Sequence, residues 1–229
     1  MDTLERPSLA ELTTDALLNL IKEQQLRDGD PIPATGDLAD RLGVSRPVVR
    51  EAVATLAGLG LVHRQQGRES VVTTPGSRQL ERLIQLRFQI QDIPYEDIQE
   101  FREFVEVDSA RLAARHATDA DLADLSSALD VLRAASTEAE LHDADVEFHR
   151  VVARAGGNDL MRLVIDAVSP LLRQLRTRVW AGWVASGGGL AEIVDAHAAI
   201  LDAISRRDES VAAAAMTAHM AQARSGLND

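Results

Sequence analysis

Residues 38–56 read LADRLGVSRPVVREAVATL, and this stretch decides the fold of the first third of the chain. Its first part suits a short helix over residues 37–42 that ends at Gly43, and Ser45 is placed to cap a second, longer helix. Apolar residues recur at helical spacing in that second helix, at Val49, Val53, Leu56 and Leu59. The pattern predicts a helix-turn-helix.

The sequence on either side extends this unit. Upstream, Ser8 and Glu11 form a capping box that opens a helix over residues 9–25. Downstream, Gly60 ends the second helix of the motif, and residues 61–64 and 70–73 read as two strands around a polar tip. We therefore expect three helices followed by a β-hairpin wing.

Charge is distributed unevenly along the chain. The 229 residues include 24 basic and 36 acidic side chains, and a net charge of -12 argues on its own against nucleic acid. However, residues 41–68 hold five arginines and one acid, and Arg46 and Arg50 lie on one helix face. Arginine can bind guanine edges or phosphates. The alternative is a solvated basic face, but the turn and the wing favour contact with DNA.

Composition excludes several classes of protein. With 45% hydrophobic residues and no cysteine, the chain has the composition of a globular protein without disulfides, thiolate metal sites or a cysteine nucleophile. Apolar runs fall short of the roughly 18 residues of a membrane span, and the N-terminal residues do not resemble a signal peptide. We expect a cytoplasmic protein with no membrane partner.

A Thr/Pro/Gly/Ser cluster at residues 73–77 marks the domain boundary, which gives domains of residues 1–75 and 76–229. The second domain has helical periodicity throughout and predicts an all-α antiparallel bundle. Two of its predicted inward stripes are Ile98, Phe101, Val105 and Leu112, and Leu160, Val164, Ala167, Leu171 and Leu175.

Four polar residues interrupt apolar stripes of this bundle. Asp145 and His149 lie one turn apart, and His197 and His219 each lie among apolar residues of a later helix. A buried carboxylate needs a partner, and a divalent cation held by these four would provide one. Zinc is the first expectation, with nickel, manganese and iron as the other candidates. The alternative is a hydrogen-bonded core cluster; His63, His116 and His142 lie off the stripes.

The first domain resembles the winged helix-turn-helix of GntR-family bacterial regulators, through LADRLGVSRPVVREAVATLAGLGLV and the wing. The resemblance implies operator contacts by Ser45, Arg46 and Arg50 and a minor-groove approach by Gln66 and Gly67 at the wing tip. The chain departs from the family pattern at three positions, which are Gly36, Pro47 and Glu69.

The second domain resembles the FCD ligand-binding domain of the FadR-type branch of that family. The matching segments include Phe101-Arg102 with Glu106, residues 145–149 and residues 216–220. The resemblance implies that Asp145, His149, His197 and His219 bind a divalent metal, that a small carboxylate metabolite sits on it, and that Arg102 receives the carboxylate. For Arg102 the alternative is a surface pair with Glu106.

Together these observations predict a sequence-specific transcription regulator, with repression as the expected sign, whose binding to double-stranded DNA responds to an organic acid. The family implies a homodimer on a palindromic operator. One alternative is a metal-responsive regulator in which the cation is the signal, and another is a metal-dependent enzyme, against which the DNA-binding motif argues. Whether Arg173, Trp180 and Trp183 line the effector pocket is left open by the sequence.

Overall fold

The computed structural model describes residues 6–64 and 69–227, and the chain divides into two compact units, residues 1–79 and 80–229. This division falls four residues after the boundary expected from the sequence. Each unit has its own buried apolar core. None of the described helices is both long and apolar enough to cross a membrane.

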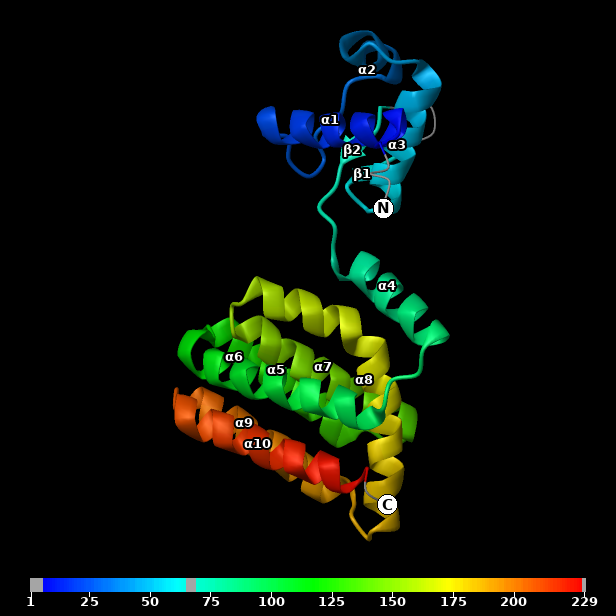
Figure 1. Ribbon diagram of the computed structural model, residues 1–229. Helices are drawn as coiled ribbons and strands as arrows, with labels where there is room; N and C mark the ends of the chain where they lie inside the picture. The colour runs from blue at the N-terminus through cyan, green and yellow to red at the C-terminus, as the bar shows by residue number, and fades with distance from the viewer. Residues whose placement is uncertain (1–5, 65–68, 228–229) are drawn as a thin grey trace. The chain divides into compact units, whose positions relative to one another are not determined.

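The N-terminal unit has the predicted winged helix-turn-helix (Figure 1). Its elements, in chain order, are α1 (Leu9–Glu23), α2 (Thr35–Leu42), α3 (Arg46–Gly58), β1 (Val62–His63) and β2 (Val71–Val72). The strands are antiparallel, with Val62 opposite Val72 and His63 opposite Val71. The predicted wing tip at residues 65–68 lies outside the described residues.

Local sequence signals explain where these helices begin and end. Ser8 and Glu11 form the capping box, with Ser8 N donating to Glu11 Oε2 at 2.6 Å. Gly43 has φ +66° and closes α2, since this left-handed conformation costs glycine little. Helix α1 ends two residues earlier than predicted because Gln25 takes a positive φ of 51°. Ser45 precedes α3 in extended conformation, but its side chain makes no capping hydrogen bond.

The rest of the described chain is helical, as predicted. Its elements are α4 (Ser77–Ile90), α5 (Tyr95–His116), α6 (Asp119–Ala134), α7 (Glu138–Ala155), α8 (Asp159–Ala185), α9 (Leu190–Ser205) and α10 (Glu209–Ser225). Capping side chains open four of these helices, from Thr118, Thr137, Asn158 and Asp208. Each cap satisfies backbone N–H groups that the first helical turn leaves without partners.

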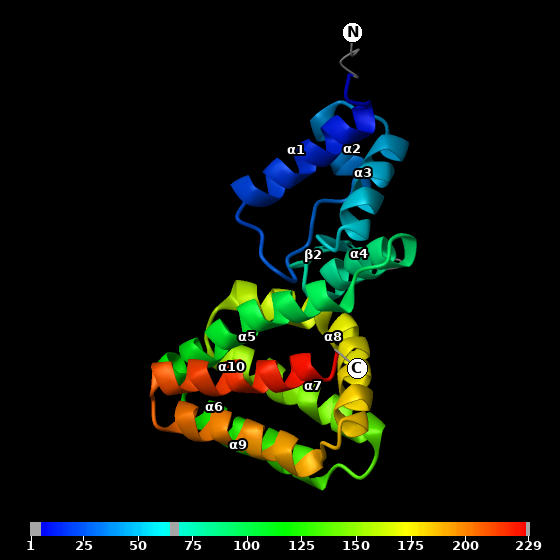
Figure 2. The same ribbon diagram turned by 60° about the horizontal axis from the view of Figure 1, so that its bottom comes forward.

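Helices α5, α6, α7, α9 and α10 pack side by side, and α8 runs along α5, α7 and α10 (Figures 1 and 2). The core between them is apolar. Its fully buried residues include Phe148, Leu125, Leu132, Ile204 and Met216. Because α7 packs against α5, α6 and α8, its inward face is enclosed by protein. The bundle can therefore hold polar residues away from water at that face.

Two helices bury only part of the face that their apolar spacing predicts. In α5, Val105 is buried as predicted, but Phe101 is 36% exposed, and the buried face also includes Gln99, Arg102, Glu106 and Ser109. In α8, Ala167 and Leu175 are buried as predicted, but Leu160 is 68% exposed, and Ile165, Val168, Leu172 and Arg176 are buried as well. The two stripes were wrong in part because they assumed that an inward face is apolar throughout.

Candidate functional site

The four predicted metal ligands meet in the middle of the bundle. Helix α7 carries Asp145 and His149 one turn apart, α9 carries His197 and α10 carries His219. Each offers one ligand atom within 4.8 Å of the others, and all four residues are between 0% and 8% exposed. A carboxylate and three imidazoles at this spacing have the composition of a zinc site or of another nitrogen and oxygen metal site.

The tautomer of His197 directs a lone pair into the centre of this cluster. His197 Nδ1 lies 2.7 Å from the carbonyl oxygen of Ile193, and a carbonyl only accepts, so Nδ1 carries the proton. His197 Nε2 then has a free lone pair. It lies 3.0 Å from Asp145 Oδ1 and makes no hydrogen bond among the described residues. Two electron-rich atoms that face each other at this distance fit a cation bound by both.

The ring of His149 also has its acceptor nitrogen, Nε2, on the side of the cluster. Arg102 Nη2 lies 3.2 Å from His149 Nε2, and because a guanidinium only donates, Nε2 is the acceptor. On the other side of the ring, His149 Nδ1 lies 2.6 Å from Glu106 Oε2, a short contact that is poorly aligned for a hydrogen bond. Such a carboxylate beside the far ring nitrogen holds a metal-binding histidine in place.

The surroundings keep the donors in the protonation states that a metal requires. Burial, partly opposed by Glu106, lowers the pKa of His149 to about 4, and burial followed by the neighbouring imidazoles holds the pKa of His219 well below its ordinary value. Burial works to raise the pKa of Asp145, but Arg176 first and then His197 and His149 outweigh it, so this pKa lies well below 3.8. Near neutral pH the cluster thus offers an ionised carboxylate at Asp145 and neutral imidazoles at His149 and His219.

Arg102, the predicted effector-binding residue, lies beside this cluster. Its side chain is 2% exposed, and its Nε donates to Glu106 Oε1 at 2.9 Å. The pair with Glu106 therefore exists, but it is buried rather than at the surface. Arg102 Nη2 also lies 4.0 Å from Asp145 Oδ2.

Arg176 and the burial of Glu106 were not predicted from the sequence. Arg176 is 4% exposed, its Nε pairs with Asp145 Oδ2, and its Nη2 lies 3.5 Å from Glu106 Oε1. It follows Leu172 by four residues and precedes Val179 by three, so it interrupts an inward stripe of α8 just as Asp145 interrupts one of α7. The sequence thus contained a signal for Arg176, on the stripe of α8 next to the stripe that was predicted to face inward.

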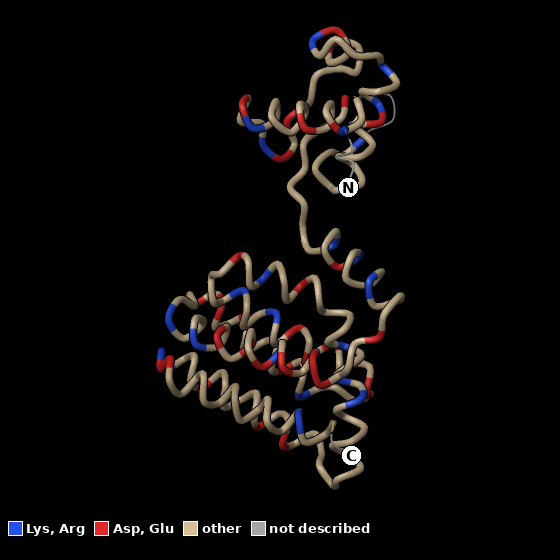
Figure 3. Tube along the Cα trace, viewed as in Figure 1, with Lys and Arg blue, Asp and Glu red and all other residues tan. Residues whose placement is uncertain are grey.

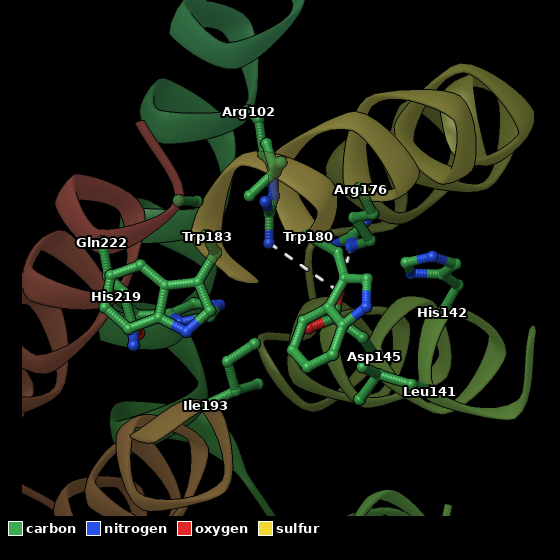
Figure 4. A pocket seen from close by; sticks show the side chains of 12 residues that line it. Arg102, Leu141, His142, Asp145, Arg176, Trp180, Trp183, Ile193, His219 and Gln222 are labelled. Carbon is green, nitrogen blue, oxygen red and sulfur yellow. Dashed lines mark hydrogen bonds and ion pairs between the residues drawn. The ribbon is translucent and has the colours of Figure 1, made fainter. Parts of the chain in front are cut away.

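A pocket opens beside the cluster, and Figure 4 shows its side chains. Arg102, Asp145, Arg176 and His219 line one part of it, and the two tryptophans, Trp180 and Trp183, line another. Arg173, the third residue left open by the sequence, instead pairs with Asp143 and is exposed. His142, which was set aside with the off-stripe histidines, is 6% exposed and lines the pocket without belonging to the group of four.

Two of the predicted DNA-contacting residues, Arg46 and Arg50, lie on α3, and Ser45 directly precedes this helix. All three are exposed, whereas Val49 and Val53 of α3 are buried in the N-terminal core. The trace in Figure 3 is coloured for basic residues along this helix, and the other two predicted residues, Gln66 and Gly67, lie outside the described part of the chain. One helix face is thus free to carry two guanidinium groups.

Gly36, one of the departures from the family pattern, lies next to this surface. A Cβ built at Gly36 would lie 3.4 Å from Arg46 Nη2, so the guanidinium of Arg46 lies over the glycine. A side chain at this position would touch that guanidinium.

Comparisons with known proteins agree for both units. Residues 9–72 match the family described as bacterial regulatory proteins, gntR family, and residues 97–222 match the FCD domain. The "HTH-type transcriptional repressor NanR" of Cronobacter sakazakii is 30% identical over 223 residues, covering 95% of this chain and 84% of the relative. The "HTH-type transcriptional regulator LutR" of Bacillus subtilis is 29% identical, covering 88% of this chain and 93% of the relative.

A solved structure described as "Streptococcus agalactiae GntR" aligns with a TM-score of 0.70 at 26% identity, covering 94% of this chain and 98% of that one. The alignment spans both units of the chain. The architecture described above, a winged helix-turn-helix followed by a helical domain, is therefore the one found in that regulator.

Proposed function

The chain belongs to the GntR family of bacterial regulatory proteins, as a transcriptional regulator with an FCD domain, and we propose that a small organic acid at a divalent metal governs its binding to DNA. The two relatives described above are named as regulators of transcription: NanR is named a repressor and LutR a regulator. In this proposal the chain is a repressor, and residues 1–75 and 76–229 are its DNA-binding and effector-binding domains.

One observation carries the metal assignment. His197 Nε2 lies 3.0 Å from Asp145 Oδ1, His149 Nε2 lies 3.2 Å from His219 Nε2, and each of the four side chains offers one ligand atom within 4.8 Å of the others. One cation held by all four residues would pair with the buried carboxylate. We propose zinc, with nickel, manganese and iron as the alternatives that the same donors would accept. When bound, the ion would supply a Lewis-acidic position for an oxygen ligand.

The charge of the buried cluster supports an acid as the effector. Ionised Asp145 and Glu106 are balanced by Arg102 and Arg176, because His149 and His219 are neutral near pH 7. A divalent cation would leave the cluster with two excess positive charges in a water-poor site. An anionic ligand offsets this excess, and Arg102 lies where it can contact a carboxylate beside Asp145.

The DNA-binding part of the proposal assigns base or phosphate contacts to Ser45, Arg46 and Arg50, and minor-groove contacts to Gln66 and Gly67. The surface of one domain is small, so we propose that the chain acts as a homodimer on a palindromic operator, where two half-sites share one binding event. The acid then needs to favour one arrangement of the two DNA-binding domains over another by only a few kcal/mol.

The alternative is a regulator for which the metal itself is the signal. A metal that acts as a fixed part of the site survives dialysis, whereas a signalling metal exchanges and changes DNA binding. Both forms of the proposal share the same ligands, so the distinction depends on which addition alters affinity for the operator.

The experiment combines metal analysis with DNA binding. Protein purified without a tag or chelator should hold about one ion per chain, and His197→Ala should abolish this content, while His116→Ala, at an exposed histidine, should not. Operator affinity is then measured with metal and with a panel of organic acids. Equal metal content in wild type and His197→Ala would refute the ligand set, and a change in affinity on adding metal alone would favour the metal-responsive alternative.

A further inference from the structure

The pocket beside the metal cluster contains two buried polar atoms that the metal does not use. Arg176 Nη1 and His142 Nε2 have no hydrogen-bond partner among the described residues, and these side chains are 4% and 6% exposed. Both residues line the pocket, and Figure 4 shows them on the side of Asp145 away from His219. A buried donor or acceptor without a partner is costly, so a ligand that pairs with both is favoured.

The two atoms pair best with different chemical groups of a ligand. Arg176 presents an N–H of a guanidinium, which binds a carboxylate oxygen best. Burial, only partly offset by Asp145, lowers the pKa of His142 and keeps its imidazole neutral, so this ring exchanges an ordinary hydrogen bond with a hydroxyl or carbonyl. The pair therefore selects a ligand with an acidic group and one further polar group.

The remaining wall of the pocket is apolar. It consists of Leu141, Val179, Trp180, Trp183, Ile193 and Ala223. The indole of Trp183 is held in place, because its Nε1 donates to Gly189 O at 3.3 Å and a Cβ at Gly188 would lie only 2.1 Å from the ring. Its polar atom is thus already paired, and the ring offers an apolar surface to a ligand.

Few polar partners remain for a polyhydroxylated ligand. Apart from the charged residues and His219, the polar groups of the described lining residues are those of His142 and Gln222 and the indole N–H of Trp180, since the N–H of Trp183 is already paired. Each hydroxyl of a sugar acid that is buried without a partner would weaken binding by roughly tenfold or more. A planar hydrocarbon body, in contrast, can stack on the indole faces.

The space between these side chains is about 40 Å³, which holds on the order of one to three water molecules. A larger ligand therefore extends out of the open side of the pocket or displaces a side chain. Arg176 is the long side chain between Asp145 and His142 in Figure 4, and a carboxylate that draws its guanidinium away from Asp145 would release a ligand oxygen of the metal cluster at the same time.

We propose that this pocket binds a carboxylic acid with a planar apolar body and one polar substituent, with Arg176 contacting the carboxylate and His142 the substituent. This inference rests on the proposed effector site and names the chemical class of its ligand. It adds Arg176 and His142 to the contacts assigned to Arg102.

The test uses intrinsic fluorescence, because the chain has two tryptophans and both line the pocket. Zinc-loaded full-length protein is titrated with phenylacetate, 4-hydroxyphenylacetate and gluconate, and calorimetry provides an independent affinity. Both aromatic acids should bind at least about tenfold more tightly than gluconate. The hydroxyl should improve affinity by about two- to tenfold through His142.

Two variants assign the contacts. His142→Phe keeps a ring and should remove the advantage of the hydroxyl while phenylacetate still binds. Arg176→Lys keeps the charge but loses the planar fork, and should weaken both aromatic acids by about tenfold. His116→Phe, at an exposed histidine outside the pocket, is the control. Melting temperature and zinc content are measured on every variant, and a variant that loses either is replaced by His142→Leu or Arg176→Gln.

The outcomes separate this inference from the proposed function. Gluconate binding as tightly as phenylacetate, no binding of either aromatic acid at millimolar concentration, or unchanged affinities in both variants would overturn the inference even if the protein binds zinc and DNA. Absence of bound metal in wild-type protein would instead overturn the proposed metal-dependent mechanism.

Discussion

Glu106 joins the charged groups of the bundle to one another. Its carboxylate lies 2.9 Å from Arg102 Nε, 3.5 Å from Arg176 Nη2 and 2.6 Å from His149 Nδ1, and its side chain is 2% exposed. Burial works to raise the pKa of Glu106, but Arg102 first, then the contact with His149 and the charge of Arg176, outweigh it and hold the pKa below its ordinary value. The carboxylate therefore stays ionised and orients one ring of the metal cluster.

Glu106→Gln is expected to weaken metal binding without removing a ligand. The amide keeps the shape of the side chain but holds the His149 ring less firmly, and loss of such a partner typically costs about 10- to 100-fold in metal affinity. Competition with a chromophoric chelator measures this. Glu103→Gln is the control, because Glu103 lies on the same helix but pairs with Arg224 at 2.8 Å, away from the cluster. Equal affinities in Glu106→Gln and wild type would contradict the assigned role.

At the scale of single residues, the sequence identifies site residues where a polar side chain interrupts an otherwise apolar stripe. Asp145, His149, His197 and His219 do so, and their donor atoms lie within 4.8 Å of one another. Glu106 and Arg102 escape that method because other polar residues, Gln99 and Ser109, share the buried face of α5 with them. A polar inward face has no apolar background against which one charged residue stands out.

At the scale of elements, the two faces of α3 have different roles, since one packs in the core and the other carries exposed basic residues. Val49, Ala52 and Leu56 are buried in the N-terminal core, while Arg46 and Arg50 are exposed. Since i and i+4 residues share a face, both arginines can meet one groove of a duplex. Removing either charge should not disturb the core.

Arg50→Ala is expected to lower operator affinity and to reduce the slope of log affinity against log salt by about one, as for one lost phosphate contact. Binding is measured by fluorescence anisotropy over a series of salt concentrations. Arg206→Ala, which removes an exposed arginine that pairs with Asp202 in the helical unit, serves as the control. An unchanged slope in Arg50→Ala would mean that this face of α3 does not contact phosphate.

Helices α8 and α10 approach each other closely where glycines replace side chains. A Cβ at Gly182 would lie 2.0 Å from Gly226 O, and a Cβ at Gly226 would lie 2.3 Å from Val179 O. Both neighbours are backbone atoms, which cannot rotate away as a side chain can. The contact fixes the end of α10, the helix that carries His219, against the helix that carries Arg176.

Gly226→Ala is therefore expected to destabilise the helical unit by about 1–3 kcal/mol, the usual cost of forcing extra atoms into a packed contact. Denaturant unfolding followed by circular dichroism measures the change. Gly58→Ala adds the same methyl group where no atom lies within 4 Å, and should cause no loss of stability. If Gly226→Ala were as stable as wild type, the close approach of the two helices would be refuted.

Sequence periodicity places the helices of both units but gives the inward faces of α5 and α8 only in part. Helix ends follow from local signals such as the Ser8 capping box and Gly43, which act over a few residues. The inward face depends instead on which neighbours pack against a helix, and here those neighbours enclose charged groups that satisfy one another. That information is not contained in one helix alone.

In the part of the chain that the structure describes, each unit has one main core, and one candidate metal site is found. The N-terminal core contains residues from α1, α2, α3 and both strands, and the second core contains residues from α5, α6, α7, α9 and α10. All four proposed ligands belong to the second unit. Metal should therefore act on the stability of one unit directly.

Zinc is expected to raise the melting temperature of the helical unit and to leave that of the N-terminal unit unchanged. A ligand that binds only the folded state at 100 times its Kd adds about 2.7 kcal/mol of stability. Differential scanning calorimetry of the full chain with zinc or chelator measures both transitions. His197→Ala should abolish the effect of zinc, and an equal rise in both transitions would contradict a site confined to the second unit.

The ligands of the proposed site are also separated in time during synthesis. The ribosome makes Asp145 and His149 on α7 long before His219 on α10, the last helix described. At about 5–20 residues per second, the 74 residues between Asp145 and His219 take roughly 4–15 s to translate. A nascent chain thus passes through seconds in which the winged domain is complete, while the effector domain lacks its final ligand and its closing helix.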